Sequence, residues 1–159
     1  MKIVCNSSVL ITLDNAGVLH VLKDLFKEIL IPKAVRKEVF KRRKLPGFVK
    51  CVEISEAIAL KVLESNLEAG EGEAICLYEE MDADLLIIDD LEGRRVAERL
   101  EINITGTLSV LLLAKREKFI DKVKPLLDEI VSHGFRVADE LYQEVLIKGD
   151  EIREQREKT

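Results

Sequence analysis

The chain has 159 residues, of which 47% are hydrophobic and 35% charged; this composition excludes a disordered protein and fits one domain with a single core. The formal net charge of −5 argues against a protein that coats nucleic acid nonspecifically. No apolar run approaches the length of a membrane span, and the first strand-like segment leaves no room for a signal peptide, so we expect a cytoplasmic protein without a membrane anchor.

The first half of the chain alternates short apolar runs with segments of helical spacing. The run KIVC begins at Lys2 and predicts a strand, and Asn6 after it is typical of a turn and helix cap. Pro32 closes the next apolar run and suits the first turn of a helix. We therefore expect a strand at 2–5, two short helices between 8 and 26, a strand at 29–31, a helix at 33–43, and a strand or edge segment at 49–54.

The most informative segment of the second half is Leu85–Ile88, a run of large apolar residues bounded by acids. Such a run is typical of a strand buried on both faces in a parallel sheet. Around it we expect helices at 55–66, 69–81 and 91–100, a short strand at 102–104, helices at 108–115, 121–132 and 138–148, and a charged end that frays. The alternation predicts an α/β fold, a three-layer α/β/α sandwich around a central parallel sheet, with one domain over 1–149 and a tail over 150–159.

Three of these strands would end beside a polar residue: Asn6 after the first, Asp90 after the buried one, and Thr107 after the last. Ligands of open parallel sheets bind beyond the carboxyl ends of the strands. Two helices expected at that edge carry inward-leaning acids, Glu38 and Glu73. Clustered carboxylates repel one another unless a cation joins them, and hard oxygen donors suit Mg²⁺ or Mn²⁺.

Each of these residues also has a plain structural interpretation. Asn6, Asp90 and Thr107 suit helix N-caps, and the glutamates could be ordinary solvated acids. For Asp89, support of the following turn is favoured over metal ligation.

Basic residues gather in two places despite the acidic balance. The segment 33–44 holds seven basic residues and one acid, and a second cluster follows the paired aspartates. Each cluster alone would be a solvated helix face. Beside a metal site they become candidate phosphate contacts, namely Lys37, Lys41, Arg42, Arg43, Arg94 and Arg95.

Several segments in this order resemble PIN-domain proteins, in particular the short prokaryotic ones: VCNSSVLITL, ILIPKAVRKEVF, GEGEAICL, DLLIIDDLEGRRVAERL, ITGTLSVLLLAK and GFRVADELYQEVL. The resemblance implies a metal-dependent ribonuclease, often the toxin of a toxin–antitoxin pair, that acts on RNA, binds an antitoxin protein and commonly forms a homodimer. It maps the metal ligands to Glu38, Glu73 and Asp90 and adds position 6 and the Thr107 hydroxyl to the catalytic site. Glu71 is a rival for Glu73, because the GEGE spelling permits either register.

The chain departs from the family pattern at Asn6, where a typical PIN domain has aspartate. An amide oxygen can still ligate Mg²⁺ or orient water, but it brings no charge, so metal affinity should drop. The alternative function is therefore a catalytically weak or inactive PIN-fold module that binds RNA or a protein. A weaker alternative is a structural partner of an antitoxin-like protein.

Overall fold

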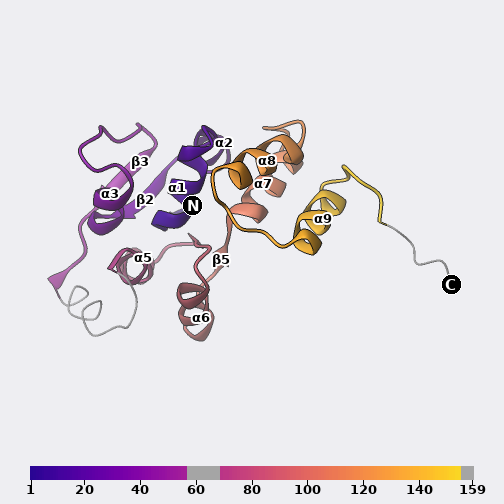
Figure 1. Ribbon diagram of the computed structural model, residues 1–159. Helices are drawn as coiled ribbons and strands as arrows, with labels where there is room; N and C mark the ends of the chain where they lie inside the picture. The colour runs from indigo at the N-terminus through magenta and orange to yellow at the C-terminus, as the bar shows by residue number, and fades with distance from the viewer. Residues whose placement is uncertain (57–68, 155–159) are drawn as a thin grey trace.

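The computed structural model describes residues 1–56 and 69–154, and its centre is a five-stranded sheet in which every pairing is parallel (Figure 1). The strand order is β3-β2-β1-β4-β5. In register, Val4 of β1 lies opposite Leu30 on one side and Leu86 on the other. The strands are β1 (Ile3–Cys5), β2 (Ile29–Pro32), β3 (Val49–Val52), β4 (Leu85–Ile87) and β5 (Ile104–Thr105).

Helices cover both faces of this sheet because its residues are apolar on both sides. Ile3 and Cys5 pack on one face with α1 (Ser7–Asn15), α2 (His20–Phe26), α3 (Lys33–Val39) and α7 (Thr107–Arg116). Val4 faces the other way, onto α5 (Ala69–Glu80) and α6 (Leu91–Arg99), which lie opposite to α1 and α7 in Figure 1. The expected three-layer α/β/α sandwich is confirmed. Within the described residues, no helix is long and apolar enough to cross a membrane.

Two further helices, α8 (Val123–Ser132) and α9 (Asp139–Lys148), pack on the outer side of α7. The chain then returns, and the Glu151 carboxylate accepts the N–H groups of Val123 (2.7 Å) and Lys124 (2.9 Å) at the start of α8. It also pairs with the Lys115 ammonium at 3.2 Å. The expectation that the chain frays from Asp150 is therefore wrong for Glu151, whose side chain is only 7% exposed.

Helix α3 is shorter than the sequence predicts and ends at Val39 rather than at residue 43. Phe40 is buried, and Lys41 has a φ of 53°, so the backbone leaves the helix there. The basic residues 41–44 consequently lie in a turn and not on a helix face.

The bounds of two strands, expected at 102–104 and 49–54, also differ from expectation. Residues 101–102 complete the end of α6, with the Ile102 N–H donating to the Ala97 carbonyl, so β5 starts only at Ile104. Segment 49–52 forms the strand β3 at one edge of the sheet. The helix expected at 55–66 lies, from residue 57 onward, outside the described residues.

Candidate active site

The carboxyl ends of β1, β4 and β5 bring the residues that follow them to one edge of the sheet. β1 pairs with β4, β4 pairs with β5, and the Asn6 N–H donates to the Ile87 carbonyl at 2.9 Å. Asn6, Asp89, Asp90 and Thr107 therefore all start from this edge, as the sequence predicts.

Asn6 is the N-cap of α1 and is 1% exposed. Its side-chain oxygen accepts the Ser7 N–H at 2.7 Å, and its amide nitrogen lies 3.5 Å from the Ser8 hydroxyl. The amide is thus held by the first turn of its own helix.

Glu38 reaches the end of β1 from α3. The Ser7 hydroxyl donates to Glu38 Oε2 at 2.7 Å, so the residue next to Asn6 holds this carboxylate in place. Sequence reasoning missed Ser7, although its position directly after Asn6 would have singled it out.

Glu73 comes from α5, on the opposite layer, and caps α3. Its Oε2 accepts the Ala34 N–H at 2.8 Å, in the first turn of α3. A carboxylate there is stabilised by the positive end of the helix dipole.

Glu38 and Glu73 line one open pocket together with Ala34 and two lysines, Lys33 and Lys37. Glu71 belongs to the same helix as Glu73 but is not among the residues that line this pocket, which favours Glu73 over Glu71 as the site acid. Lys33 belongs to the basic cluster at 33–44 but was not among the six predicted phosphate contacts, although it lies one helical turn before Lys37.

Asp90 is the N-cap of α6, and its Oδ2 accepts the Gly93 N–H at 2.8 Å. Gly93 packs closely here, because an added Cβ would come within 2.4 Å of the end of the Ile88 side chain, which would have to move. Asp90 does not line the glutamate pocket. Across the described residues, no three acidic, histidine or cysteine side chains are grouped closely enough to hold a metal ion.

Asp89, which follows β4, bonds to Thr107, the first residue of α7 after the neighbouring strand β5. Its two oxygens accept the Thr107 N–H (2.9 Å) and hydroxyl (2.5 Å), and Thr107 is fully buried. Gly106 between them leaves room for this contact, since a Cβ there would lie 2.5 Å from Asp89 Oδ1. Gly106 is the N-cap of α7, so the N-cap expected at Thr107 is one residue off.

Below this contact, Cys5 is fully buried. Burial raises the pKa of the Cys5 thiol well above its usual value, and the negative charge of Asp89 raises it further. The thiol is therefore neutral and unreactive in the folded protein.

The six predicted phosphate contacts divide into two groups. Arg43 is fixed by Asp14 and the Val39 carbonyl, both at 2.9 Å, and Arg94 donates to the Ile88 carbonyl at 3.0 Å. Both arginines bond within the fold, but the Arg43 side chain is 59% exposed, so its role as a phosphate contact stays a prediction. The other four are Lys37 in the glutamate pocket, Lys41 and Arg42 exposed in the turn, and Arg95 exposed and paired with Glu92.

The donor set fits a divalent cation of the Mg²⁺ type. Glu38 and Glu73 each use one oxygen, Oε2, in the hydrogen bonds described, and each has a second oxygen to offer in the shared pocket. Mg²⁺ keeps several waters and is commonly bound through one or two carboxylates plus substrate phosphates. Two carboxylates in one pocket match this mode of binding.

A protein-family model described as a PIN domain matches residues 2–151, nearly the whole chain. No curated protein matches the chain in a sequence search.

Proposed function

The chain belongs to the PIN-domain family, a nuclease fold whose members generally use divalent metals and bind RNA, and from this premise we propose that it is a Mg²⁺- or Mn²⁺-dependent endoribonuclease. The observation that carries the proposal is the pocket in which Glu38 of α3 and Glu73 of α5 meet beside two lysines. Paired carboxylates next to ammonium groups suit a cation and the phosphate that bridges to it.

In this proposal Glu38 and Glu73 would hold the ion, and Asp90, which caps α6 outside their pocket, stays a predicted ligand that the geometry of the described residues does not join to them. Lys33 and Lys37 hold the phosphate of the strand to be cut. A bound divalent ion generates a nucleophilic water at neutral pH and neutralises the charge that develops on the phosphate.

Asn6 and Thr107 act as positioning residues in the same proposal, because their polar groups already bond within the protein. Asn6 fixes the turn that presents Ser7, and the Ser7 hydroxyl fixes Glu38. Thr107 fixes Asp89, the neighbour of Asp90.

A cleavage assay tests the proposal. Wild type should cut a fluorescent single-stranded RNA with Mn²⁺ or Mg²⁺ and not with EDTA. Glu73→Gln should lower the rate by at least about 100-fold, because even the outer partners of metal ligands contribute about 10- to 100-fold. The matched control is Glu79→Gln, an exposed position on the same helix, which should cut like wild type. Cleavage in EDTA, or equal rates for the two variants, would refute the assignment.

Asn6 supports a second candidate function, because it brings no charge to the position where a typical PIN domain has aspartate. A PIN-fold module that binds RNA or a protein without cutting would keep the basic residues and lose the reaction. It would bind the same RNA in the presence of Mn²⁺ and leave the strand intact over hours.

We further propose the roles that the family commonly has, a toxin restrained by an antitoxin protein, a homodimer, and a place in the cytoplasm. Expression that stops growth, and recovery when a small neighbouring gene is co-expressed, would support the toxin role. Light scattering of the purified chain decides between a monomer and a dimer.

A further inference from the structure

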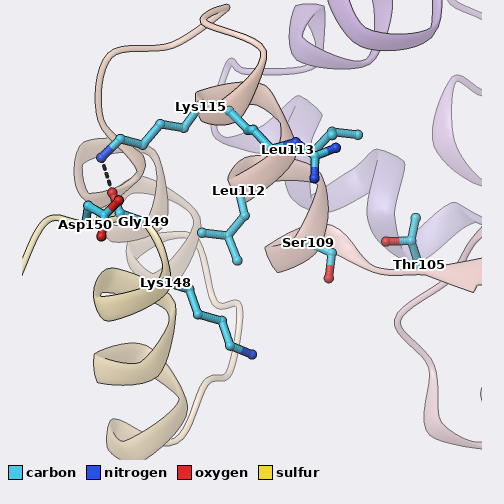
Figure 2. A pocket seen from close by; sticks show the side chains of 9 residues that line it. Thr105, Ser109, Leu112, Leu113, Lys115, Lys148, Gly149 and Asp150 are labelled. Carbon is cyan, nitrogen blue, oxygen red and sulfur yellow. Dashed lines mark hydrogen bonds between the residues drawn. The ribbon is translucent and has the colours of Figure 1, made fainter. Parts of the chain in front are cut away.

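A groove runs along α7 on the side that faces α9 (Figure 2). Two hollows make it up, and they share Ser109, Leu112 and Lys148. The second hollow also includes Asp89 and Gly106, so the groove ends at the Asp89–Thr107 contact on the carboxyl edge of the sheet. In Figure 2, Ser109 and Leu112 of α7 face the side of α9 from which Lys148 extends.

The side chains that line this α7–α9 groove carry a net positive charge, whereas the net charge of the chain is negative. The chain has 30 acidic and 25 basic residues, excluding histidine. The groove is lined by five basic side chains (Arg94, Lys115, Arg116, Arg136, Lys148) and three acidic ones (Asp89, Glu144, Asp150). The acid nearest the carboxyl edge, Asp89, has both oxygens occupied by Thr107. Lys115 is already held by Glu151 and the Gly149 carbonyl, so the positive charge that a polyanion could meet in the groove comes from Arg116, Arg136 and Lys148.

Three of the basic side chains are placed to reach a ligand. Arg116 is 76% exposed and Lys148 is 61% exposed, and Arg136 lies exposed between α8 and α9. Lys148 pairs with Glu144 at 3.1 Å and Arg116 with Glu117 at 3.6 Å. Exposed pairs of this kind are weak, so a phosphate can replace the carboxylate.

Apart from the hydroxyl groups of Thr105 and Ser109, the remaining lining is mostly apolar, which decides what kind of polyanion fits. Leu112, Phe135 and Leu141 line the groove, and Leu141 is 42% exposed. Unpaired bases can lie against such side chains while the backbone meets the basic ones. A duplex turns its bases inward and would leave these apolar side chains uncovered.

We propose that the α7–α9 groove binds single-stranded RNA and leads the strand to the carboxyl edge of the sheet. The proposal rests on the proposed function for the identity of the ligand. It assigns phosphate contacts to Arg116, Arg136 and Lys148, none of which belongs to the glutamate pocket.

Fluorescence anisotropy with a labelled 12-nucleotide single-stranded RNA, in EDTA, tests this groove without any cleavage. Lys148→Glu should weaken binding at least about 5-fold at 0.1 M salt, because a single-strand phosphate contact releases about 0.7 counterion. The slope of log affinity against log salt should become shallower by about 0.7, and by about 1.4 in the double variant with Arg136→Glu.

The matched control is Lys23→Glu, which also reverses an exposed lysine in the last turn of a helix, α2, away from the groove. It should bind like wild type. Arg136 lies outside any helix, so Arg136→Gln provides a second groove variant if Lys148→Glu does not fold.

Three results would overturn the groove assignment. These are no binding by wild type, equal affinity and slope for Lys148→Glu and Lys23→Glu, or equally tight, equally sensitive binding of duplex RNA. The cleavage assay separates this proposal from the proposed function. RNA that binds through the groove and is never cut refutes only the nuclease, and cutting that groove variants leave unchanged refutes only the groove.

Discussion

At the level of single residues, Asn6 differs from aspartate in charge and hardly in shape. Its side-chain oxygen caps α1, and an aspartate oxygen would accept the same Ser7 N–H. The residue is 1% exposed, so a charge placed there would be almost completely removed from water. Asn6 therefore preserves the cap while sparing the apo protein a buried anion.

Asn6→Asp should lower the stability of the protein in EDTA by about 1–3 kcal/mol, the usual cost of a buried group without a full set of partners. With Mn²⁺ the same charge should strengthen ion binding, so the rise in melting temperature on adding Mn²⁺ should exceed that of wild type. Thermal melts with and without Mn²⁺ measure both effects. Glu73→Gln, in the glutamate pocket, serves as the opposite control and should reduce the rise. Equal shifts in wild type and Asn6→Asp would place residue 6 outside the metal site.

Thr107 and Asp89 form the other buried polar contact of this edge. Thr107→Val keeps the shape of the side chain but leaves Asp89 Oδ2 without its hydroxyl donor. We expect a loss of about 1–3 kcal/mol in the free energy of unfolding, measured by urea denaturation. Thr105→Val is the matched control, because Thr105 is only partly buried in β5, and it should change stability by less than about 0.5 kcal/mol. Similar losses in the two variants would mean that the Asp89–Thr107 contact does not stabilise the fold.

At the level of elements, the sequence predicts where helices begin better than where they end. Pro32 marks the start of α3 through its own geometry, and the structure begins the helix directly after it. The end of α3 depends on distant residues, because Phe40 is buried in the core and Arg43 pairs with Asp14. Lysine and arginine are good helix formers, so local sequence alone extends the helix through them. The same holds for Glu151, whose partners at the start of α8 are far away in the sequence.

Glu151 should make the α7–α8–α9 layer sensitive to acid. Burial alone would raise the pKa of the Glu151 carboxyl, but the N–H groups of Lys124 and Val123 and the Lys115 ammonium outweigh it and hold the pKa below its usual value. A lowered folded-state pKa adds stability that is present above the unfolded pKa and is lost as the pH falls through the folded one. Glu151→Gln should therefore cost about 1–3 kcal/mol at pH 7 and less below about pH 4.

Urea denaturation of wild type and Glu151→Gln from pH 3 to 7 measures this difference. Glu154→Gln, an exposed acid of the same segment, is the control and should follow wild type. A difference between wild type and Glu151→Gln that stays constant over the whole range would contradict the linkage.

At the level of the whole molecule, the parallel α/β/α sandwich follows from the alternation of apolar runs and helices, and the structure confirms it. The sequence also placed Asn6, Asp90 and Thr107 at one edge. The sequence did not show that Asp89, rather than Asp90, bonds to Thr107. Adjacent residues after a strand point in different directions, and the position of the neighbouring strand decides which of them meets a partner. The groove between α7 and α9 was not foreseen either, since it depends on how two helices far apart in the chain pack together.

The buried thiol of Cys5 can report how often the folded domain opens locally. This thiol is fully enclosed under Asp89 and kept neutral, so a thiol reagent can modify it only during moments when this edge of the sheet opens. In a background with Cys51→Ser and Cys76→Ser, labelling of Cys5 should be orders of magnitude slower than in urea-unfolded chain, and Thr107→Val should speed it up more than Thr105→Val. Equal labelling rates in folded and unfolded protein would contradict this. Because Asn6 and Ser7 directly follow this strand and the Ser7 hydroxyl bonds to Glu38, the labelling rate reports how often the structure beside the glutamate pocket opens without any RNA or metal in the solution.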